Sequence, residues 1–163
     1  MPQWCTPLGH FLSDLRNTMI EEFLNTERIT DAIARSYYEQ GDGVLREFKL
    51  RVKRRVDLIT INDKGWITII EIKSSLADFR NDKKWNEYIE WADQFYFGVA
   101  HNFPIDILPK EHGIITTDGF DIYKVQPSPV QKLNGSRRNT LVRKLARASM
   151  RRVEYERNDL MSI

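Results

Sequence analysis

The sequence predicts an α/β (α+β) protein with a mixed central β-sheet flanked by helices. Two neighbouring stretches, 55–61 and 66–73, are rich in Ile, Val and Thr, which favour pleated, half-buried strands. Apolar residues recur at helical spacing on both sides of this strand pair. The 163 residues and 41% hydrophobic content suit one domain with a sizeable core. We expect a single domain over 1–163, with an N-terminal helix at about 8–24, a core at about 27–126 and a basic C-terminal helix at about 137–156.

The first two elements are predicted to be amphipathic helices. The apolar stripe of the first helix consists of Leu8, Phe11, Leu12, Leu15, Met19 and Phe23. This stripe fits ordinary packing against a core, and a partner-binding helix is the alternative. Thr26 would cap the second helix, and Gly41 and Gly43 would end it. Its inner face would be Ile29, Ala32, Ile33 and Tyr37.

A strand over 44–50, which contains Glu47, is expected next and is followed by a β-hairpin. The hairpin turn, 62–65, fits a type I turn with Gly65 in the left-handed conformation. This turn places Asn62 opposite Trp66 and thereby sets the register of the two strands. The expected cross-strand pairs are Ile61 with Ile67, Ile59 with Ile69, Asp57 with Glu71, and Arg55 with Lys73.

The hairpin register predicts which side chains share a face of the sheet. One face is apolar and consists of Val56, Leu58, Ile70 and Ile72. The other face consists of Ile59, Ile61, Ile67 and Ile69 and, at its far end, Asp57, Glu71 and Lys73. Cross-strand β-carbons lie roughly 5 Å apart, so the two carboxylates would repel each other, more strongly when buried. A hard divalent cation with oxygen ligands would relieve this repulsion, with Lys73 beside it.

The remaining elements follow from turn and helix signals. Ser75 with Asp78 fits a capping box, so a turn or helix should begin there, and helical spacing continues to about Asp93. A buried strand over 94–100, a hairpin of 113–117 and 120–125, and a final helix with Leu141, Leu145 and Ala148 facing inward complete the chain. Core packing is expected for Trp85, Tyr88 and Trp91, with base stacking as the alternative.

Charge and cysteine content exclude several classes of protein. The formal net charge is only +2, but basic residues cluster at 51–55 and at 137–152. Cys5 is the only cysteine, so neither an internal disulfide nor a cysteine-based zinc site can form. The N-terminus lacks signal-peptide features, and no apolar run approaches the roughly 20 residues of a membrane span. We expect a cytoplasmic protein without a membrane partner.

The Asp57 strand and the strand Glu71-Ile72-Lys73 resemble the catalytic core of the PD-(D/E)xK nuclease superfamily. The resemblance implies a restriction-endonuclease-like α-β-β-β-α-β core, in which Val56 replaces the Pro of the superfamily name. A longer set of residues is similar to the bacterial MmcB family of DNA-repair proteins, over roughly 28–125 and most specifically over 55–97. This set is Arg55-Val-Asp-Leu, Glu71-Ile-Lys-Ser-Ser, Asp78-Phe, Asp82-Lys-Lys-Trp85 and Glu87-Tyr88.

The resemblance implies a metal-dependent DNA nuclease, or a nuclease-like DNA-repair protein, that hydrolyses phosphodiester bonds. Asp57 and Glu71 would hold Mg²⁺ or Mn²⁺, with the backbone carbonyl of Ile72 as a third ligand. Lys73 would complete the catalytic set by orienting water or offsetting negative charge. Glu47 is a further candidate ligand, at a position where such folds often place an acidic residue. Candidate DNA-binding residues are Ser75, Arg55, Lys83, Lys84, Arg147 and Arg151.

Each group of candidate residues also fits a purely structural role, without catalysis or ligand binding. Asp57, Glu71 and Lys73 could form a structural ion-pair cluster with Arg55. The basic C-terminal helix fits either a DNA-backbone contact or a plain exposed helix. Glu47 could be a paired or solvated strand residue, Ser75 a helix cap, and Lys83 and Lys84 part of a solvated face. The alternative function is a catalytically inactive nuclease-fold module that binds DNA structures or recruits repair proteins.

Overall fold

The computed structural model describes residues 24–51 and 54–161, and a six-stranded sheet in the order β1-β2-β3-β4-β5-β6 lies at its centre. The strands are β1 (Gly43–Arg51), β2 (Arg54–Ile61), β3 (Ile67–Lys73), β4 (Gln94–Ala100), β5 (Gly113–Thr117) and β6 (Ile122–Gln126). The β3–β4 and β4–β5 pairs are parallel and the other pairs antiparallel, so the sheet is mixed, as predicted. The helix expected at about 8–24 falls outside the described residues, apart from Leu24.

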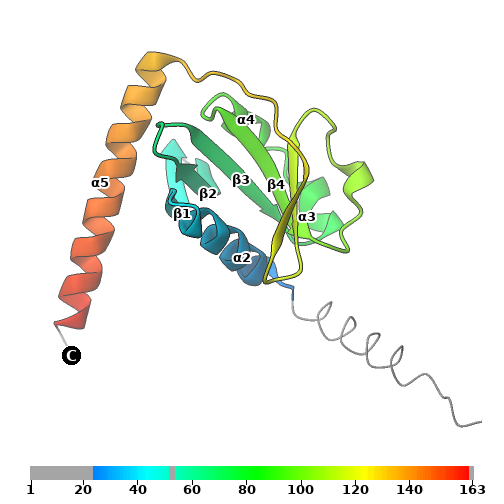
Figure 1. Cartoon of the computed structure of the whole chain (residues 1–163), viewed down its shortest axis with the longest axis horizontal. Coiled ribbons are helices and arrows are strands. Elements are labelled where there is room, and N and C mark those ends of the chain that lie inside the picture. Colours follow the sequence, from blue (N-terminus) through cyan, green and yellow to red (C-terminus); the bar gives the residue numbers. More distant parts are fainter. Residues whose placement is uncertain (1–23, 52–53, 162–163) are drawn as a thin grey trace, which may run out of the picture.

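Helices cover both faces of this sheet (Figure 1). They are α2 (Thr26–Glu39), α3 (Leu76–Asn81), α4 (Asn86–Ile89) and α5 (Gly135–Leu160), with a short 3-10 helix, η1 (Ile105–Ile107). Helix α2 packs on the face that carries Leu58, Ile70 and Ile72. Residues of or beside α3, α4 and α5 pack on the opposite face, where the larger core forms. Within the described ranges, no helix is long and apolar enough to cross a membrane.

Helix α2 confirms the predicted inner face but begins with a different cap. Asn25, rather than Thr26, is the N-cap, because the Asn25 Oδ1 accepts the Arg28 N–H at 3.0 Å. The inner face predicted from the sequence is buried, and it consists of Ile29, Ala32, Ile33 and Tyr37. Gly41 follows the helix with a φ of +93°, a conformation that glycine adopts without steric cost.

The β2–β3 turn is as the sequence predicts, but the predicted register holds only for the half of the hairpin next to the turn, and the expected pairs Asp57–Glu71 and Arg55–Lys73 are not formed. The Asn62 N–H donates to the Trp66 carbonyl at 3.1 Å, and Gly65 has a φ of +75°. The predicted pairs Ile61–Ile67 and Ile59–Ile69 are confirmed. The ladder between β2 and β3 extends from the turn to the Leu58–Ile70 pair, one position short of the expected pairing of Asp57 with Glu71.

In the β1–β2 strand pair, the faces to which the side chains point are exchanged at Glu47, which has a φ of +50°. Non-glycine residues rarely adopt this left-handed conformation. Beyond it, Phe48 and Val56 pair with each other and join the core on the α5 side. The prediction that Val56 shares a face with Leu58 and Ile70 is therefore wrong, because strict alternation does not continue through a left-handed residue.

The stretch from Ser75 to about Asp93, where a turn or helix and continuing helical spacing were expected, forms two short helices, α3 and α4. Ser75 does cap the first of these, because its Oγ accepts the Asp78 N–H at 3.1 Å. The chain leaves the helical conformation at Asp82, where φ is −97° and ψ is 114°. This extended residue turns its carboxylate towards Lys73 on β3.

Asp93 fixes α5 to the sheet. Its side chain is 2% exposed, and its carboxylate accepts the N–H groups of Ile67 at 2.8 Å and Leu133 at 3.0 Å. Arg138, near the start of α5, donates to both carboxylate oxygens at 2.8 and 2.5 Å. Burial alone would raise the pKa of Asp93, but the hydrogen bonds from Arg138, Ile67 and Leu133 hold that pKa below its ordinary value.

Replacing Asp93 by Asn should destabilise the fold by about 2 to 3 kcal/mol, because Arg138 would lose its charged partner and the two N–H groups a strong acceptor. Urea unfolding followed by circular dichroism measures this change. Asp106→Asn, at an exposed position in η1, is the control and should change stability by less than about 0.5 kcal/mol. Equal stabilities for the two variants would show that Asp93 does not anchor α5.

Candidate active site

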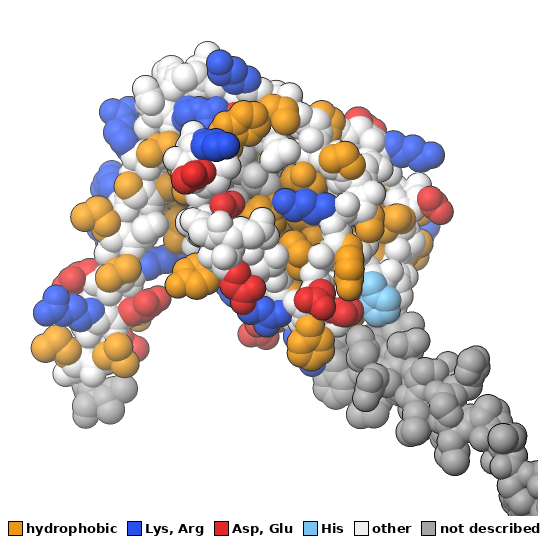
Figure 2. All heavy atoms as spheres, in the orientation of Figure 1, with side chains coloured by type: hydrophobic (Ala, Val, Ile, Leu, Met, Phe, Trp, Pro, Cys, Tyr) orange, Lys and Arg blue, Asp and Glu red, His pale blue; other side chains and the backbone are white. Residues whose placement is uncertain are grey.

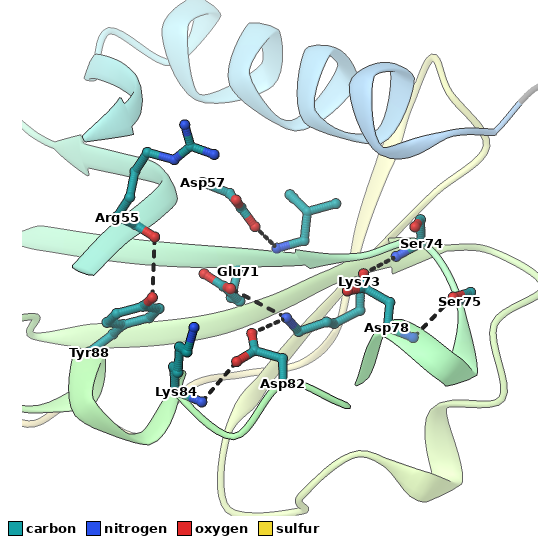
Figure 3. Close-up of polar contacts among 11 residues, drawn as sticks. Arg55, Asp57, Glu71, Lys73, Ser74, Ser75, Asp78, Asp82, Lys84 and Tyr88 are labelled. Carbon is teal, nitrogen blue, oxygen red and sulfur yellow. Dashed lines mark hydrogen bonds and ion pairs between the residues drawn. The ribbon is translucent and has the colours of Figure 1, made fainter. Parts of the chain in front are cut away.

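The candidate site forms where β2 separates from β3. Beyond Leu58, β2 continues to pair with β1, whereas β3 continues to pair with β4. Asp57 occupies the resulting gap, and its Oδ2 accepts the Ile72 N–H at 2.8 Å (Figure 3). A side chain of β2 thus takes the place of a backbone acceptor. Because the N–H and C=O of one strand residue point towards the same neighbour, the Ile72 carbonyl also faces this gap.

Glu71 and Lys73 lie on β3 and are almost completely buried, at 5% and 2% exposure. The Lys73 Nζ is 3.3 Å from the Glu71 Oε1. The other carboxylate oxygen of Glu71, Oε2, is buried and has no hydrogen-bond partner among the described residues. Buried polar atoms are nearly always satisfied in folded proteins, so this oxygen marks a position where a ligand would be accommodated.

Asp82 is a member of the site that the sequence did not identify. Its Oδ2 accepts a hydrogen bond from the Lys73 Nζ at 2.6 Å, and its Oδ1 accepts the Lys84 N–H at 2.8 Å (Figure 3). The residue stands in the Asp82-Lys-Lys-Trp85 string, which was its only signal. Its role could not be predicted because it depends on where the chain leaves α3.

Burial is the main influence on the charges of the two candidate ligands. Burial, followed by the nearby charge of Asp57, raises the pKa of Glu71 to about 8, although the charge and hydrogen bond of Lys73 oppose this shift. Burial also raises the pKa of Asp57, opposed by the hydrogen bond from Ile72. Both carboxylates therefore favour protonation more than ordinary ones do. A nearby divalent cation would reverse this preference.

Lys73 and Asp82 form the charged pair of the site. Burial alone would lower the pKa of Lys73, but the hydrogen bond to Asp82 and the charge of Glu71 raise it above its ordinary value. Burial would raise the pKa of Asp82, and the hydrogen bonds from Lys73 and Lys84 instead lower it. Asp82 is thus ionised and keeps the buried Lys73 charged.

The donor set fits a hard divalent cation. The free Glu71 oxygen, the half-buried carboxylate of Asp57 and the Ile72 carbonyl are all oxygen donors, which Mg²⁺ and Mn²⁺ prefer. No group of three or more His, Cys, Asp or Glu side chains is close enough for metal binding in the described ranges. Glu47 therefore does not join Asp57 and Glu71 in a three-carboxylate set, and such a cation would keep several waters as ligands.

Helix α4 holds the beginning of β2 in place beside the site. Arg54 donates to Glu87 through two hydrogen bonds, both 2.6 Å long. The Tyr88 hydroxyl donates to the Arg55 carbonyl at 3.2 Å (Figure 3). Together these contacts fix the strand two residues before Asp57, so the position of Asp57 depends on the break between α3 and α4.

Residues 16–159 match a protein family described as "DNA repair protein MmcB-like". The chain belongs to the MmcB-like family. A solved structure of a protein of unknown function from Silicibacter pomeroyi has the same fold, with a TM-score of 0.78 and 36% sequence identity. That similarity covers 82% of this chain and 92% of the other. No curated protein matches the chain at a significant level.

The other candidate residues of this MmcB-like protein lie around the site rather than in it. Arg55 is exposed and pairs with Glu47 at 3.4 Å, so it does not balance Glu71, and the predicted pairing with Lys73 is wrong. Lys83 and Lys84 are exposed beside Asp82, and Ser75 acts as a helix cap. The two remaining candidates are on the exposed surface of α5, and they are Arg147 and Arg151.

A purely structural ion-pair cluster remains the alternative interpretation, and it explains part of the geometry. It accounts for Lys73, Asp82 and one oxygen of Glu71. It does not account for the unsatisfied Glu71 Oε2, or for the raised pKa values of both Glu71 and Asp57, because a cluster evolved only for stability would satisfy these groups.

The raised pKa of Glu71 predicts how stability depends on pH. Between the ordinary value of 4.5 and about 8, the folded protein retains a proton that the unfolded chain has released. This contribution to stability is therefore complete below about 4.5 and is lost as the pH rises through about 8. Glu71→Gln cannot titrate, so it should lose less unfolding free energy than the wild type between about pH 5 and about pH 8.

Urea denaturation at a series of pH values measures this difference. Glu39→Gln, at an exposed position on α2, is the control and should follow the wild-type curve. If Glu71→Gln also follows the wild-type curve, the folded protein does not hold an extra proton at Glu71.

Proposed function

We propose that this MmcB-like protein is a metal-dependent nuclease that hydrolyses DNA phosphodiester bonds at Asp57, Glu71 and Lys73. The observation that carries this proposal is the free, buried Oε2 of Glu71 beside the Asp57 carboxylate, in a gap between strands. The family description supports DNA repair as the setting. The residue order along the hairpin, which resembles the PD-(D/E)xK superfamily, supports the chemistry.

Each residue of the site has a role that follows from its contacts. Asp57, the free Glu71 oxygen and the Ile72 carbonyl would hold Mg²⁺ or Mn²⁺, which when bound polarises a phosphate and lowers the pKa of water. Lys73 keeps a positive charge at the reaction centre and can orient the attacking water or offset charge on the phosphate. Asp82 positions the Lys73 ammonium through a hydrogen bond. The same ammonium contacts only one of the two Glu71 carboxylate oxygens.

A second candidate function is a DNA-binding module with the same fold and no hydrolysis. The observation that favours it is the low exposure of Glu71 and Lys73, 5% and 2%, which leaves Asp57 as the more accessible of the three side chains. Binding of DNA without cleavage in any divalent metal, and without measurable Mn²⁺ binding, would decide in favour of this module.

Asp57→Asn and Glu71→Gln should each reduce DNA cleavage by at least about a hundredfold, because each removes a charged oxygen ligand. Supercoiled plasmid and single-stranded DNA, incubated with Mg²⁺ or Mn²⁺ and analysed on gels, measure the activity. Calorimetry should show Mn²⁺ binding that is lost in both variants. Glu111→Gln, at an exposed position outside the candidate site, is the control and should cleave DNA as the wild type does. If wild type and Asp57→Asn cleave equally well, the assigned site is wrong.

Asp82→Asn should reduce cleavage by about tenfold, because Lys73 loses the partner that keeps it charged and in place. Burial would then lower the Lys73 pKa, so the alkaline limit of the pH–activity profile should move to lower pH. Asp82→Glu should restore part of the activity. Asp121→Asn, an exposed aspartate, is the control. An unchanged pH profile in Asp82→Asn would show that Asp82 does not act through Lys73.

A further inference from the structure

A basic groove lies between α5 and the edge strand β1. Its volume is about 420 Å³, and its walls are Glu47, Phe48, Lys49, Lys144, Arg147, Ala148, Arg151 and Arg152. Five of these eight residues are cationic and one is acidic. The projecting helix that forms one wall is visible beside β1 in Figure 1, and Figure 2 shows charged side chains along it.

The cations of this groove come from two separate elements and lack carboxylate partners. Within the described part of the chain, none of Lys49, Arg147, Arg151 and Arg152 forms an ion pair. Lys144 reaches across the groove and donates to the Leu50 carbonyl at 3.3 Å. Like charges held on two facing walls repel each other, so the arrangement favours an anion between them.

Packing holds the groove open, and one of its lining residues, Glu47, also lines a hollow that contains Asp57. Leu141 and Leu145 are buried under α5, and Arg138 is tied to Asp93, so the helix cannot move freely onto β1. Glu47 lines both this groove and a second hollow of about 390 Å³. The second hollow also contains Asp57, so Glu47 lines both the groove and the hollow of one candidate ligand.

The dimensions suit a nucleic-acid strand. From Lys144 to Arg151 the α-helix rises by about 10 Å, at roughly 1.5 Å per residue. A DNA strand carries one phosphate per roughly 3.4 Å of duplex axis. The cationic wall is therefore long enough to contact more than one phosphate, and its mostly cationic lining suits backbone contacts rather than base recognition.

We propose that the α5–β1 groove binds the phosphate backbone of DNA and directs the strand towards Asp57. The identification of DNA as the ligand rests on the proposed function. The charge and shape of the groove are observed independently of that function. Binding here is sequence-independent, because the groove offers cations and no group placed to read base edges. Both side chains of the Arg55–Glu47 ion pair are exposed, and Glu47 lines the groove as well as the hollow that contains Asp57.

The test compares two double variants that remove equal charge from the same helix. Arg147→Ala/Arg151→Ala alters the groove, and Arg143→Ala/Arg157→Ala alters α5 positions that do not line it. Fluorescence anisotropy with a labelled DNA duplex, in EDTA so that cleavage cannot occur, gives the affinity over a range of salt concentrations. The groove variant should bind about tenfold more weakly, and its salt dependence should have a slope smaller by about two.

Three further outcomes decide the proposal. Arg147→Lys/Arg151→Lys, which keeps the charge, should restore most of the affinity. Equal loss of affinity in the groove and outer variants would overturn the proposal, because it would show a diffuse effect of charge. Polyglutamate of equal charge that binds as tightly as DNA would also overturn it, since the groove would then be a general anion surface.

The groove and the nuclease can fail separately. Wild-type protein that does not cleave DNA, but loses affinity only in the groove variant, would support the groove and reject the hydrolysis. A groove variant that binds and cleaves DNA as the wild type does would reject the groove and leave the catalytic site intact. Circular dichroism and thermal unfolding verify that each variant is folded.

Discussion

The buried ammonium of Lys73 is the constraint on which the rest of the site depends. A charge that is only 2% exposed must be paired, and one partner, Asp82, lies beyond the end of α3. Asp82 can reach Lys73 because the chain is extended there, and this break separates α3 from α4. The start of α4 then places Glu87 and Tyr88 against the beginning of β2. The buried charge of Lys73 is thus linked to the position of the beginning of β2, the strand that carries Asp57.

The second determinant is an interruption of the sheet. If β2 and β3 remained paired past Leu58 and Ile70, backbone groups would occupy the gap. Because β2 turns with β1 at Glu47, the Asp57 carboxylate becomes the acceptor for the Ile72 N–H. The left-handed residue is therefore linked to the chemistry, since it allows the β1–β2 strand pair to leave the sheet where the carboxylates meet. Strained conformations of this kind are often found at functional sites.

The sequence predicted what local chemistry determines and missed what depends on distant contacts. The strands and the hairpin register followed from Gly65 and the alternation of β-branched residues; the strands are confirmed, and the register is confirmed from the turn to the Ile59–Ile69 pair. The pairing of Arg55 with Lys73 failed because it assumed that two strands remain paired along their whole length. Asp82 was missed because its role requires knowledge of Lys73 burial and of where a helix stops. Asn25 and Thr26 both belong to residue types that favour the N-cap, and the backbone conformation shows that Asn25 occupies it.

The structural and metal-binding interpretations of the cluster describe two protonation states of the same residues. In the first state, Lys73 and Asp82 are charged and Glu71 retains a proton, so the cluster is nearly neutral and can remain buried without a cation. On the proposed function, the second state requires Glu71 to release that proton, because a metal binds the carboxylate and not the acid. The burial that raises the Glu71 pKa therefore stabilises the first state and makes metal affinity increase with pH. Lys73 pairs with Asp82 through a contact that does not involve Glu71, so on the proposed function the loss of the Glu71 proton need not disturb the fold that this pair supports.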